Sequence, residues 1–422
     1  MNAPGVSPTP SRREPRLPAY ALISDVPPAK NGGYGSQVLA WNWAEAVGED
    51  LKLVLTHHQH QALSKEQVVR DLRAPVLFYP DLSQVRVWRR MEAIKSLAEL
   101  MLGLLWVPKM VSGLRRRGAQ RLFAFVSNSG WFLPIADQTA RRAGLPLDYY
   151  LVDDLEASAG LWRHPVQARL MRWLEPRMLR RASRVFTISP GYGEHLLSKY
   201  QVRSAWLPIA IRQMALEYHP YQPATPDVRC LTFIGGVGPL YSECLKDCLR
   251  VIEQWNRQQP AFRLRLLLMT YTSPALIARE VGVHPDLEVL IRPPPEDFTR
   301  RLQTSWAVFV PYSFGSAERV MVTCSFPTKL TDAALAGRPV LVYGPAYASL
   351  PRYFAENHLP ICVLSREGLG PAVRDIGTVD SPALIERYQS VVQSFHSPGY
   401  LRRTLAVEPA SPAAGDPSHP EL

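Results

Sequence analysis

Residues 325–345, SFPTKLTDAALAGRPVLVYGP, constrain the fold more than any other part of the chain. Ser325 is placed to cap a helix, and Pro327 is tolerated in its first turn because those N–H groups have no intrahelical partner. Gly337 favours a left-handed helix end, and the proline two residues later prevents the helix from continuing. The apolar run VLVY that follows is typical of a short strand. The segment therefore predicts a helix, a sharp stop and a strand.

The first turn of this helix has the chemistry of a nucleotide-diphosphate site. Orphan N–H groups and the positive end of the helix dipole attract phosphate. Lys329 adds a positive charge there, and Asp332 shares its face at i, i+3 spacing and can accept two hydrogen bonds from a ribose diol. Leu330 belongs to a separate apolar stripe. The alternative interpretation is an ordinary amphipathic helix with a solvated Lys–Asp pair.

The same segment resembles the nucleotide-sugar-binding segment of GT-B glycosyltransferases, in the family-4-like branch of bacterial polysaccharide and glycolipid enzymes. The signature there is small-Pro-x-Lys-Leu-x-Glu-Tyr-x-x-x-Gly-x-Pro-Val. Asp332 stands in place of the Glu and Ala333 in place of the aromatic residue, and Cys324 replaces the first Glu of the commoner two-Glu motif. The resemblance implies donor phosphates on Lys329 and the donor ribose on Asp332. The positions that match are Pro327, Lys329, Leu330, Gly337, Pro339 and Val340.

Charge divides the chain into two unlike halves. Residues 1–212 contain 29 Lys and Arg against 17 Asp and Glu, a net charge of +12 within a total of +11. A basic half joined to a neutral one indicates an anionic partner for the basic half. Nucleic acid is disfavoured because the basic residues are scattered over helices without a recognisable binding module. An anionic membrane or a phosphate-bearing substrate remains.

The first half opens with a strand followed by a glycine-rich turn, as in nucleotide-binding α/β domains. The strand, Tyr20–Asp25, leads into Gly32, Gly33 and Tyr34, and a helical stretch and a second strand follow. The glycines lack the spacing of a dinucleotide fingerprint, so a plain turn is the alternative. The resemblance implies that backbone amides here approach the donor phosphates, at Gly33, and the acceptor, at Gly32 and Tyr34.

Two adjacent carboxylates, Asp153 and Asp154, follow the predicted strand LDYYLV. Ligands of open α/β sheets bind at the carboxyl ends of the strands, and a carboxylate in that cleft can accept the proton of an acceptor hydroxyl. The resemblance also implies a substrate-contacting or basic residue at this strand end. We therefore name both as candidate catalytic bases. A helix cap or a surface turn is the alternative.

The second half repeats the first. Cys230–Ile234 predicts a strand, and Gly235 and Gly236 form the turn after it, on the donor side of the predicted site. Tyr312 follows another predicted strand, where the resemblance implies that it stacks on the base or holds a phosphate. The chain is thus expected to contain two similar α/β domains that face each other.

A long apolar helix bordered by cations is predicted between Trp88 and Arg117, with a break near Pro108. Tryptophan and arginine at the ends of an apolar stretch are typical of a helix that lies on an anionic membrane. Packing of the same apolar face on the protein's own sheet is the alternative. The candidate membrane contacts are Trp88, Arg89, Arg90, Trp106, Arg115, Arg116 and Arg117.

The predicted fold class is α/β of the GT-B type, with two facing Rossmann-like domains and a C-terminal helix that returns to the first domain. The expected parts are disordered tails at 1–17 and 407–422, an acceptor domain at 18–212, a linker at 213–228, a nucleotide-sugar domain at 229–383 and the returning helix at 384–406.

The expected function is transfer of a hexose from a nucleotide sugar to a hydroxyl of a saccharide or lipid-linked acceptor, in polysaccharide, exopolysaccharide or glycolipid biosynthesis. No metal or other cofactor is expected, because Lys329 and helix dipoles can stabilise the leaving phosphate. The expected location is cytoplasmic, peripheral at the inner face of the cell membrane. A nucleotide-sugar epimerase on the same fold and a non-catalytic GT-B-like binding protein are the alternatives.

Overall fold

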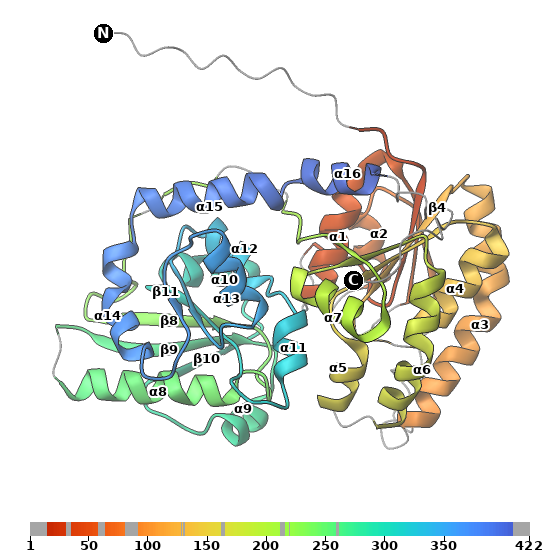
Figure 1. Cartoon of the computed structure of the whole chain (residues 1–422). Coiled ribbons are helices and arrows are strands. Elements are labelled where there is room, and N and C mark those ends of the chain that lie inside the picture. The colour runs from red at the N-terminus through yellow and green to blue at the C-terminus, as the bar shows by residue number, and fades with distance from the viewer. Residues whose placement is uncertain are drawn as a thin grey trace, which may run out of the picture.

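The computed structural model contains two α/β domains side by side, each built on a parallel sheet (Figure 1). It describes residues 15–30, 35–57, 64–80, 92–127, 129, 131–161, 165–211, 216–218, 220–258 and 261–407. Both sheets have helices on their two faces, and their central strands are largely buried and apolar. This is the two-domain Rossmann-like architecture that the sequence predicts.

The first sheet has seven strands in the order β3-β2-β1-β4-β5-β6-β7. The chain turns from one direction of strand addition to the other between β1 and β4, and ligands of such sheets bind beyond the carboxyl ends of the strands at this point. The strands are β1 (Tyr20–Ser24), β2 (Leu51–His57), β3 (Val76–Tyr79), β4 (Arg121–Val126), β5 (Leu147–Leu151), β6 (Arg184–Thr187) and β7 (Ala205–Trp206).

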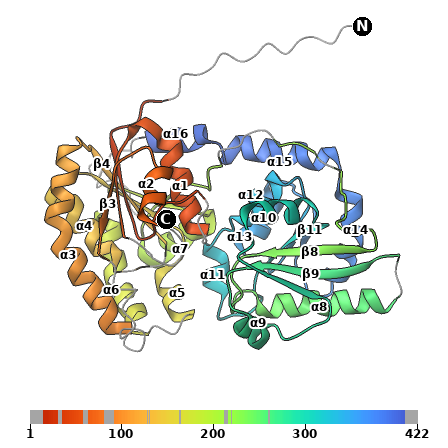
Figure 2. The ribbon, with the colours of Figure 1, turned by 180° about the vertical axis from the view of Figure 1, so that it is seen from behind.

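Helices pack on both faces of this sheet. Helix α3 packs on α4, which also contacts α6, and the three lie on the outer side of the domain (Figures 1 and 2). The helices are α1 (Gly35–Val47), the short 3₁₀ helix η1 (Gly48–Asp50), α2 (Lys65–Asp71), α3 (Glu92–Arg116), α4 (Phe132–Ala143), α5 (Leu155–Leu161), α6 (Pro165–Arg181) and α7 (Pro190–Tyr200).

The expected break of α3 at Pro108 is wrong, because the helix continues through this residue to Arg116. A proline inside a helix removes one N–H and displaces the carbonyl four residues earlier. Pro108 is exposed, on the side of the helix away from the sheet. The freed carbonyl can therefore be solvated, and the helix tolerates the proline.

The second sheet repeats this plan with six strands in the order β10-β9-β8-β11-β12-β13, turning between β8 and β11. Its strands are β8 (Val228–Ile234), β9 (Arg263–Thr270), β10 (Leu287–Ile291), β11 (Ala307–Pro311), β12 (Val340–Tyr343) and β13 (Cys362–Val363). Its helices are α8 (Ser242–Arg257), α9 (Pro274–Glu280), α10 (Pro295–Gln303), α11 (Arg319–Cys324), α12 (Lys329–Leu335), α13 (Ser349–Glu356) and α14 (Leu369–Val379).

The helix of the 325–345 segment ends as predicted but begins later. Gly337 is left-handed, with a φ of +65°, and its N–H donates to the carbonyl of Ala334 at 3.0 Å. Ser325 is not the N-cap: its N–H bonds to the carbonyl of Met321 at 2.9 Å and so completes the preceding helix, α11. Helix α12 begins only at Lys329. The expectation that Ser325 caps it is therefore wrong.

The returning helix is confirmed, but it is two helices. Helix α15 (Pro382–Phe395) crosses from the second domain, and α16 (Pro398–Ala406) packs against α1 (Figure 1). The hydroxyl of Ser397 accepts the N–H of Tyr400 at 3.0 Å, and the proline after Ser397 starts the new helix. The prediction of a single helix from 384 to 406 is therefore wrong.

The first domain also begins earlier than predicted. Leu17 is buried in the core, and the carbonyl of Pro15 accepts a hydrogen bond from Arg402 at 3.2 Å. Residues 15–17 therefore belong to the fold and not to a tail. The predicted tails at residues 1–14 and 408–422 lie outside the described residues.

Candidate active site

The two domains meet where the carboxyl ends of their sheets carry the predicted site residues. A Cβ added at Gly35 would lie 3.0 Å from the Oγ1 of Thr328, so the start of α1 touches the residue just before α12. The hydroxyl of Ser189 donates to the carbonyl of Cys324 at 2.7 Å across the same boundary. The start of α1 thus lies against the predicted donor segment. Gly32, Gly33 and Tyr34 themselves lie outside the described residues.

Lys329 occupies an unusual position for a cation. Its side chain is buried, and its Nζ lies 4.2 Å from the ring centroid of Phe233 and 4.1 Å from that of Tyr241. In the described part of the chain this amine has no hydrogen-bond partner. Burial lowers the pKa of Lys329 to about 7, and the nearby charge of Asp332 opposes that shift only in part. The amine is therefore poised to take up an anion.

The turn after β8 approaches this amine closely. Gly235 has a φ of +121°, and a Cβ there would lie 3.0 Å from the Cε and 3.4 Å from the Nζ of Lys329. Only glycine adopts that conformation without strain and leaves room for the lysine. A Cβ at Gly236 would lie 2.5 Å from the hydroxyl oxygen of Tyr271. The structure thus brings both predicted glycines and Lys329 together.

The other predicted donor residues lie around Lys329 in different roles. Asp332 is half-buried, and burial raises its pKa to about 6 against the opposing charge of Lys329. Leu330 packs in the core, and Pro327 lies partly buried in the extended stretch before α12. Of these residues, Asp332 alone offers a polar side chain beside Lys329.

Tyr312 contacts the backbone of the 325–328 stretch that precedes α12. Its ring is 3% exposed, and its hydroxyl lies 3.2 Å from the Oγ of Ser349 and 3.5 Å from the carbonyl of Ser325. The hydroxyl of Ser349 also donates to that carbonyl. A buried ring with an engaged hydroxyl leaves no open face for a base. Tyr312 and Ser325 therefore hold the backbone that precedes α12.

The two candidate bases differ sharply in their contacts. Asp154 is fully buried and caps α5 by accepting the N–H of Ala157 at 2.7 Å. It also lies 3.1 Å from the Nε2 of His195 and 3.3 Å from the Nζ of Lys199. Burial alone would raise its pKa, but these hydrogen bonds and charges lower the pKa below its ordinary value. The cap interpretation is thus the one that fits Asp154.

Asp153 is the carboxylate that remains available for proton transfer. Its backbone carbonyl accepts the hydroxyl of Tyr192 at 2.9 Å, but its carboxylate accepts no hydrogen bond from the described residues, and burial, with the charges of Asp154 and Asp25, raises its pKa to about 7. After burial, the charge of Asp153 is the largest cause of the raised pKa of Tyr241, in the second domain. Tyr241 is the ring under the amine of Lys329. The charge of Asp153 therefore acts across the domain boundary on a ring that contacts the Lys329 amine.

Sequence reasoning missed part of this site. Asp25 follows β1 as Asp153 follows β5, and its carboxylate accepts the N–H groups of Ser127, at 3.0 and 2.9 Å, and of Ser129, at 2.9 Å. The position of Asp25 at a strand end was a usable signal. Nothing in the sequence distinguishes Tyr241 from an ordinary core aromatic residue.

The predicted membrane helix, α3, both packs on its own domain and exposes apolar side chains, so features of both interpretations are present. Met110 and Leu114 of α3 pack in the core under the sheet, while Leu97, Met101 and Leu105 are 53%, 53% and 72% exposed. By length and composition, Leu97–Arg116 is able to cross a membrane, and 33% of that window is buried in the domain. One face therefore packs in the domain and the other is exposed.

The charged end of α3 is exposed as well. Arg115, Arg116 and Arg117 are exposed, and the Nζ of Lys109 lies 4.0 Å from the ring centroid of the half-buried Trp106. Trp88, Arg89 and Arg90 lie outside the described residues.

The two facing domains, the switch points of both sheets and the returning C-terminal helices define the GT-B fold. The solved structures that are similar to this chain include sucrose-phosphate synthase from Thermosynechococcus elongatus, at 13% identity and a TM-score of 0.66, covering 92% of this chain and 97% of that one. WaaG, a glycosyltransferase involved in lipopolysaccharide biosynthesis, is 16% identical with a TM-score of 0.56, covering 92% and 98%.

The N-terminal domain of Candida albicans trehalose-6-phosphate phosphatase is 9% identical with a TM-score of 0.62, covering 95% of this chain and 98% of that one. No protein-family model and no curated protein matches the sequence. At these identities the likeness establishes the fold, and the chemistry must be argued from this chain's own residues.

Proposed function

We propose that this protein is a glycosyltransferase that moves a hexose from a nucleotide-diphosphate donor to a hydroxyl of an acceptor. The observation that carries this proposal is the buried amine of Lys329, which no described residue pairs. A buried cation without a partner is costly, and a diphosphate next to the Gly235 turn would supply the missing charge and hydrogen bonds. Asp332, three residues further along the helix, is then available to the donor ribose.

The chemistry divides between the domains. As the bond between the anomeric carbon and the phosphate oxygen breaks, negative charge grows on the leaving nucleoside diphosphate, and the Lys329 ammonium stabilises it. A new bond forms between the anomeric carbon and the acceptor oxygen, and Asp153 takes the proton of that hydroxyl. A carboxylate with a pKa of about 7 is well matched to a general base at neutral pH.

We further propose that the acceptor is lipid-linked and that the protein lies on the anionic inner face of the cell membrane, in polysaccharide or glycolipid assembly. The support is the net charge of +12 over residues 1–212 and the exposed apolar side of α3 next to Arg115–Arg117. The similarity to WaaG, which is involved in lipopolysaccharide biosynthesis, fits this proposal.

The test is thermal stabilisation by nucleotides. UDP, GDP, dTDP and CMP are compared on the parent chain, on Lys329→Met and on Lys246→Met, an exposed lysine paired with Glu243 that serves as the matched control. One diphosphate is expected to stabilise the parent and the control, by about 3 kcal/mol at a hundred times its Kd, and not Lys329→Met. Stabilisation by no nucleotide, or equal stabilisation of Lys329→Met, contradicts the proposed donor site.

The stabilising base then identifies the donor for a product assay. Transfer gives a glycosylated acceptor plus the nucleoside diphosphate, whereas an epimerase converts the nucleotide sugar without an acceptor. A product that forms only when an acceptor hydroxyl is present supports the proposal. Conversion of the nucleotide sugar alone contradicts it.

A further inference from the structure

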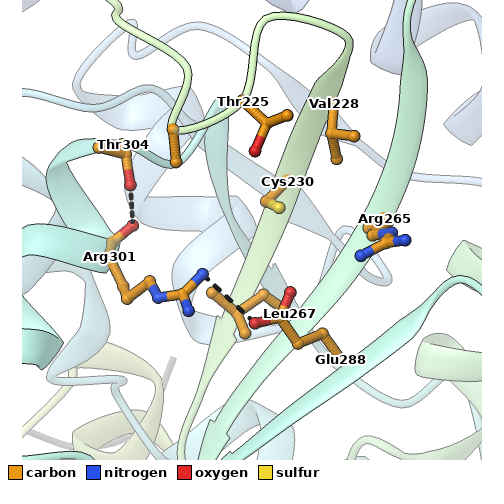
Figure 3. Close-up of a pocket in the computed structure, with 9 residues that line it drawn as sticks. Thr225, Val228, Cys230, Arg265, Leu267, Glu288, Arg301 and Thr304 are labelled. Atoms are coloured by element: carbon orange, nitrogen blue, oxygen red, sulfur yellow. Dashed lines mark hydrogen bonds and ion pairs between the residues drawn. The ribbon is translucent and has the colours of Figure 1, made fainter.

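A cavity lies in the second domain, away from the donor segment (Figure 3). It has a volume of about 70 Å³ and is floored by one face of β8, β9 and β10, with the end of α10 and the interdomain linker at its rim. Cys230 in its floor is five residues before Gly235, roughly 16 Å along the strand. The cavity is therefore separate from the site of Lys329. The lining residues that matter are Thr225, Cys230, Arg265, Glu288, Arg301 and Thr304.

The charges around this cavity do not balance. Arg301 forms an ion pair with Glu288, with Nη1 3.3 Å from Oε1. Arg265 has a buried Nε for which the described residues offer no hydrogen-bond partner. The lining thus holds two guanidinium groups against one carboxylate. A buried donor without an acceptor costs free energy unless a solvent molecule or a ligand satisfies it.

Cys230 lines the same cavity as these three charged groups. Burial raises the pKa of Cys230 to about 11, the charge of Glu288 adds to the shift, and the charges of Arg265 and Arg301 oppose it. Cys230 and Arg265 are paired in register on adjacent strands, so the thiol lies beside the unpaired guanidinium. The reactivity of the Cys230 thiol should therefore change when a ligand binds in the cavity.

The size of the cavity selects the kind of ligand. A water molecule needs about 10–15 Å³ of cavity volume, whereas drug-sized and nucleotide ligands occupy pockets of several hundred Å³. The planar guanidinium fork matches the oxygens of a phosphoryl group. We propose that this cavity is a second binding site, which takes a single phosphoryl oxyanion on Arg265, opposite the Arg301–Glu288 pair. Because Thr225 belongs to the linker between the domains, a bound anion touches the segment that connects them.

The test follows alkylation of Cys230 by N-ethylmaleimide, read by peptide mass spectrometry on the full chain. Cys362 is the internal reference, because it is also half-buried and burial likewise raises its pKa to about 11. At fixed pH and ionic strength, inorganic phosphate at ten times its Kd is expected to slow labelling of Cys230 about tenfold and to leave Cys362 unchanged. Glycerol phosphate in a parallel arm shows whether a phosphate ester also enters.

Three variants separate this site from others. Arg265→Gln should abolish the protection, while Arg257→Gln, an exposed arginine of the same domain, should retain it. Lys329→Met should also retain it, which distinguishes this site from the proposed donor site. If Arg265→Gln does not fold, Arg301→Gln replaces it, because Glu288 then neutralises Arg265. Undiminished protection in Arg265→Gln, or no protection of Cys230 in the parent, overturns the proposal.

Discussion

At the scale of single residues, neighbours in sequence have opposite roles. Asp153 and Asp154 are indistinguishable in the sequence, yet Asp154 caps α5 and pairs with His195, while the carboxylate of Asp153 accepts no hydrogen bond from the described residues. A residue engaged on several sides holds structure, and a half-buried carboxylate with a raised pKa is available for chemistry.

We therefore expect opposite outcomes from the same substitution at the two positions. Asp153→Asn should lower kcat by about 10²–10⁴-fold while leaving the melting temperature and nucleotide affinity near parental values. Asp154→Asn should lower the free energy of unfolding by about 1–3 kcal/mol, because it weakens a cap and leaves buried partners short of an acceptor. Turnover and urea unfolding measure the two. A fully active Asp153→Asn variant would exclude it as the base.

The low pKa of Lys329 predicts how nucleotide affinity depends on pH. The free amine loses its proton near pH 7, but the ammonium is the form that binds a diphosphate, so binding above that pH must take up a proton. The Kd should therefore rise up to about tenfold per pH unit above about pH 7. Calorimetry in two buffers of different ionisation enthalpy measures both the Kd and the proton uptake. If the parent and Lys329→Met share one pH profile, Lys329 is not the titrating group.

Much of this site could be predicted from local rules, and the rest depends on tertiary contacts. The i, i+3 spacing placed Asp332 next to Lys329, and the strand-end rule placed Asp153 just beyond β5. The prediction that Ser325 caps α12 failed because its N–H donates to the preceding helix, α11. The residues around Ser325 give no sign of this hydrogen bond. The two aromatic rings that contact the amine of Lys329 come from distant parts of the sequence: Phe233 lies in β8 and Tyr241 just before α8. Aromatic residues at such positions usually indicate only that the side chain packs in the hydrophobic core.

At the scale of elements, α3 has one packed face and one exposed apolar face. Replacing Leu97, Met101 and Leu105 together by Ser should reduce binding to vesicles that contain anionic lipid by at least about tenfold, because each inserted apolar side chain contributes about 1.5–3 kcal/mol. Stability should hardly change, since these side chains are at least 53% exposed. Vesicle sedimentation and thermal melting measure the two effects.

The matched control is Val283→Ser, which removes an apolar side chain that is 93% exposed on the second domain. It should bind vesicles as the parent does. Replacing Arg115–Arg117 by Gln should weaken binding mainly at low salt, by about 1 kcal/mol per arginine. Vesicle binding that survives all of these changes would remove α3 from the membrane contact.

The sequence predicted the type of most helices and strands correctly, but predicted their first and last residues less well. Apolar runs located most of the strands, since the central strands of both sheets are largely buried. Pro108 did not end α3, because it lies on the exposed side of the helix. The sequence alone does not show which side of the helix will face solvent. In the final helix, the pattern Ser397-Pro398 was the start signal for α16, and it was overlooked within an otherwise helical stretch.

At the scale of the whole molecule, His396 joins the parts of the GT-B fold. Its ring is 1% exposed, with Nδ1 2.7 Å from the carbonyl of Ile209, at the end of the first domain, and Nε2 2.7 Å from the hydroxyl of Tyr353, in α13. The carbonyl of His396 accepts the N–H of Ile211 at 2.8 Å. A neutral imidazole satisfies both ring contacts, with Nδ1–H as donor and Nε2 as acceptor. This residue lies where α15 gives way to α16.

The joint should therefore make stability depend on pH. Burial lowers the pKa of His396 to about 4, against the opposing hydrogen bond to Ile209, while an unfolded chain protonates histidine at its ordinary value of 6.5. Between these values the unfolded state binds more protons, so stability falls as the pH falls from about 6.5 to about 4 and is fully present above that window. At pH 5 the loss from this residue should be about 2 kcal/mol.

Urea unfolding at pH 7 and pH 5 measures this contribution against two variants. His396→Asn should be less stable than the parent at pH 7, because the ring's packing and one contact are lost, but it should lose about 2 kcal/mol less on going to pH 5. His358→Asn is the control, since that histidine is exposed and its φ of +51° is one that asparagine tolerates. The control should keep the parental pH dependence. If His396→Asn also keeps it, other groups account for the acid sensitivity, and the joint between the domains does not depend on a neutral imidazole.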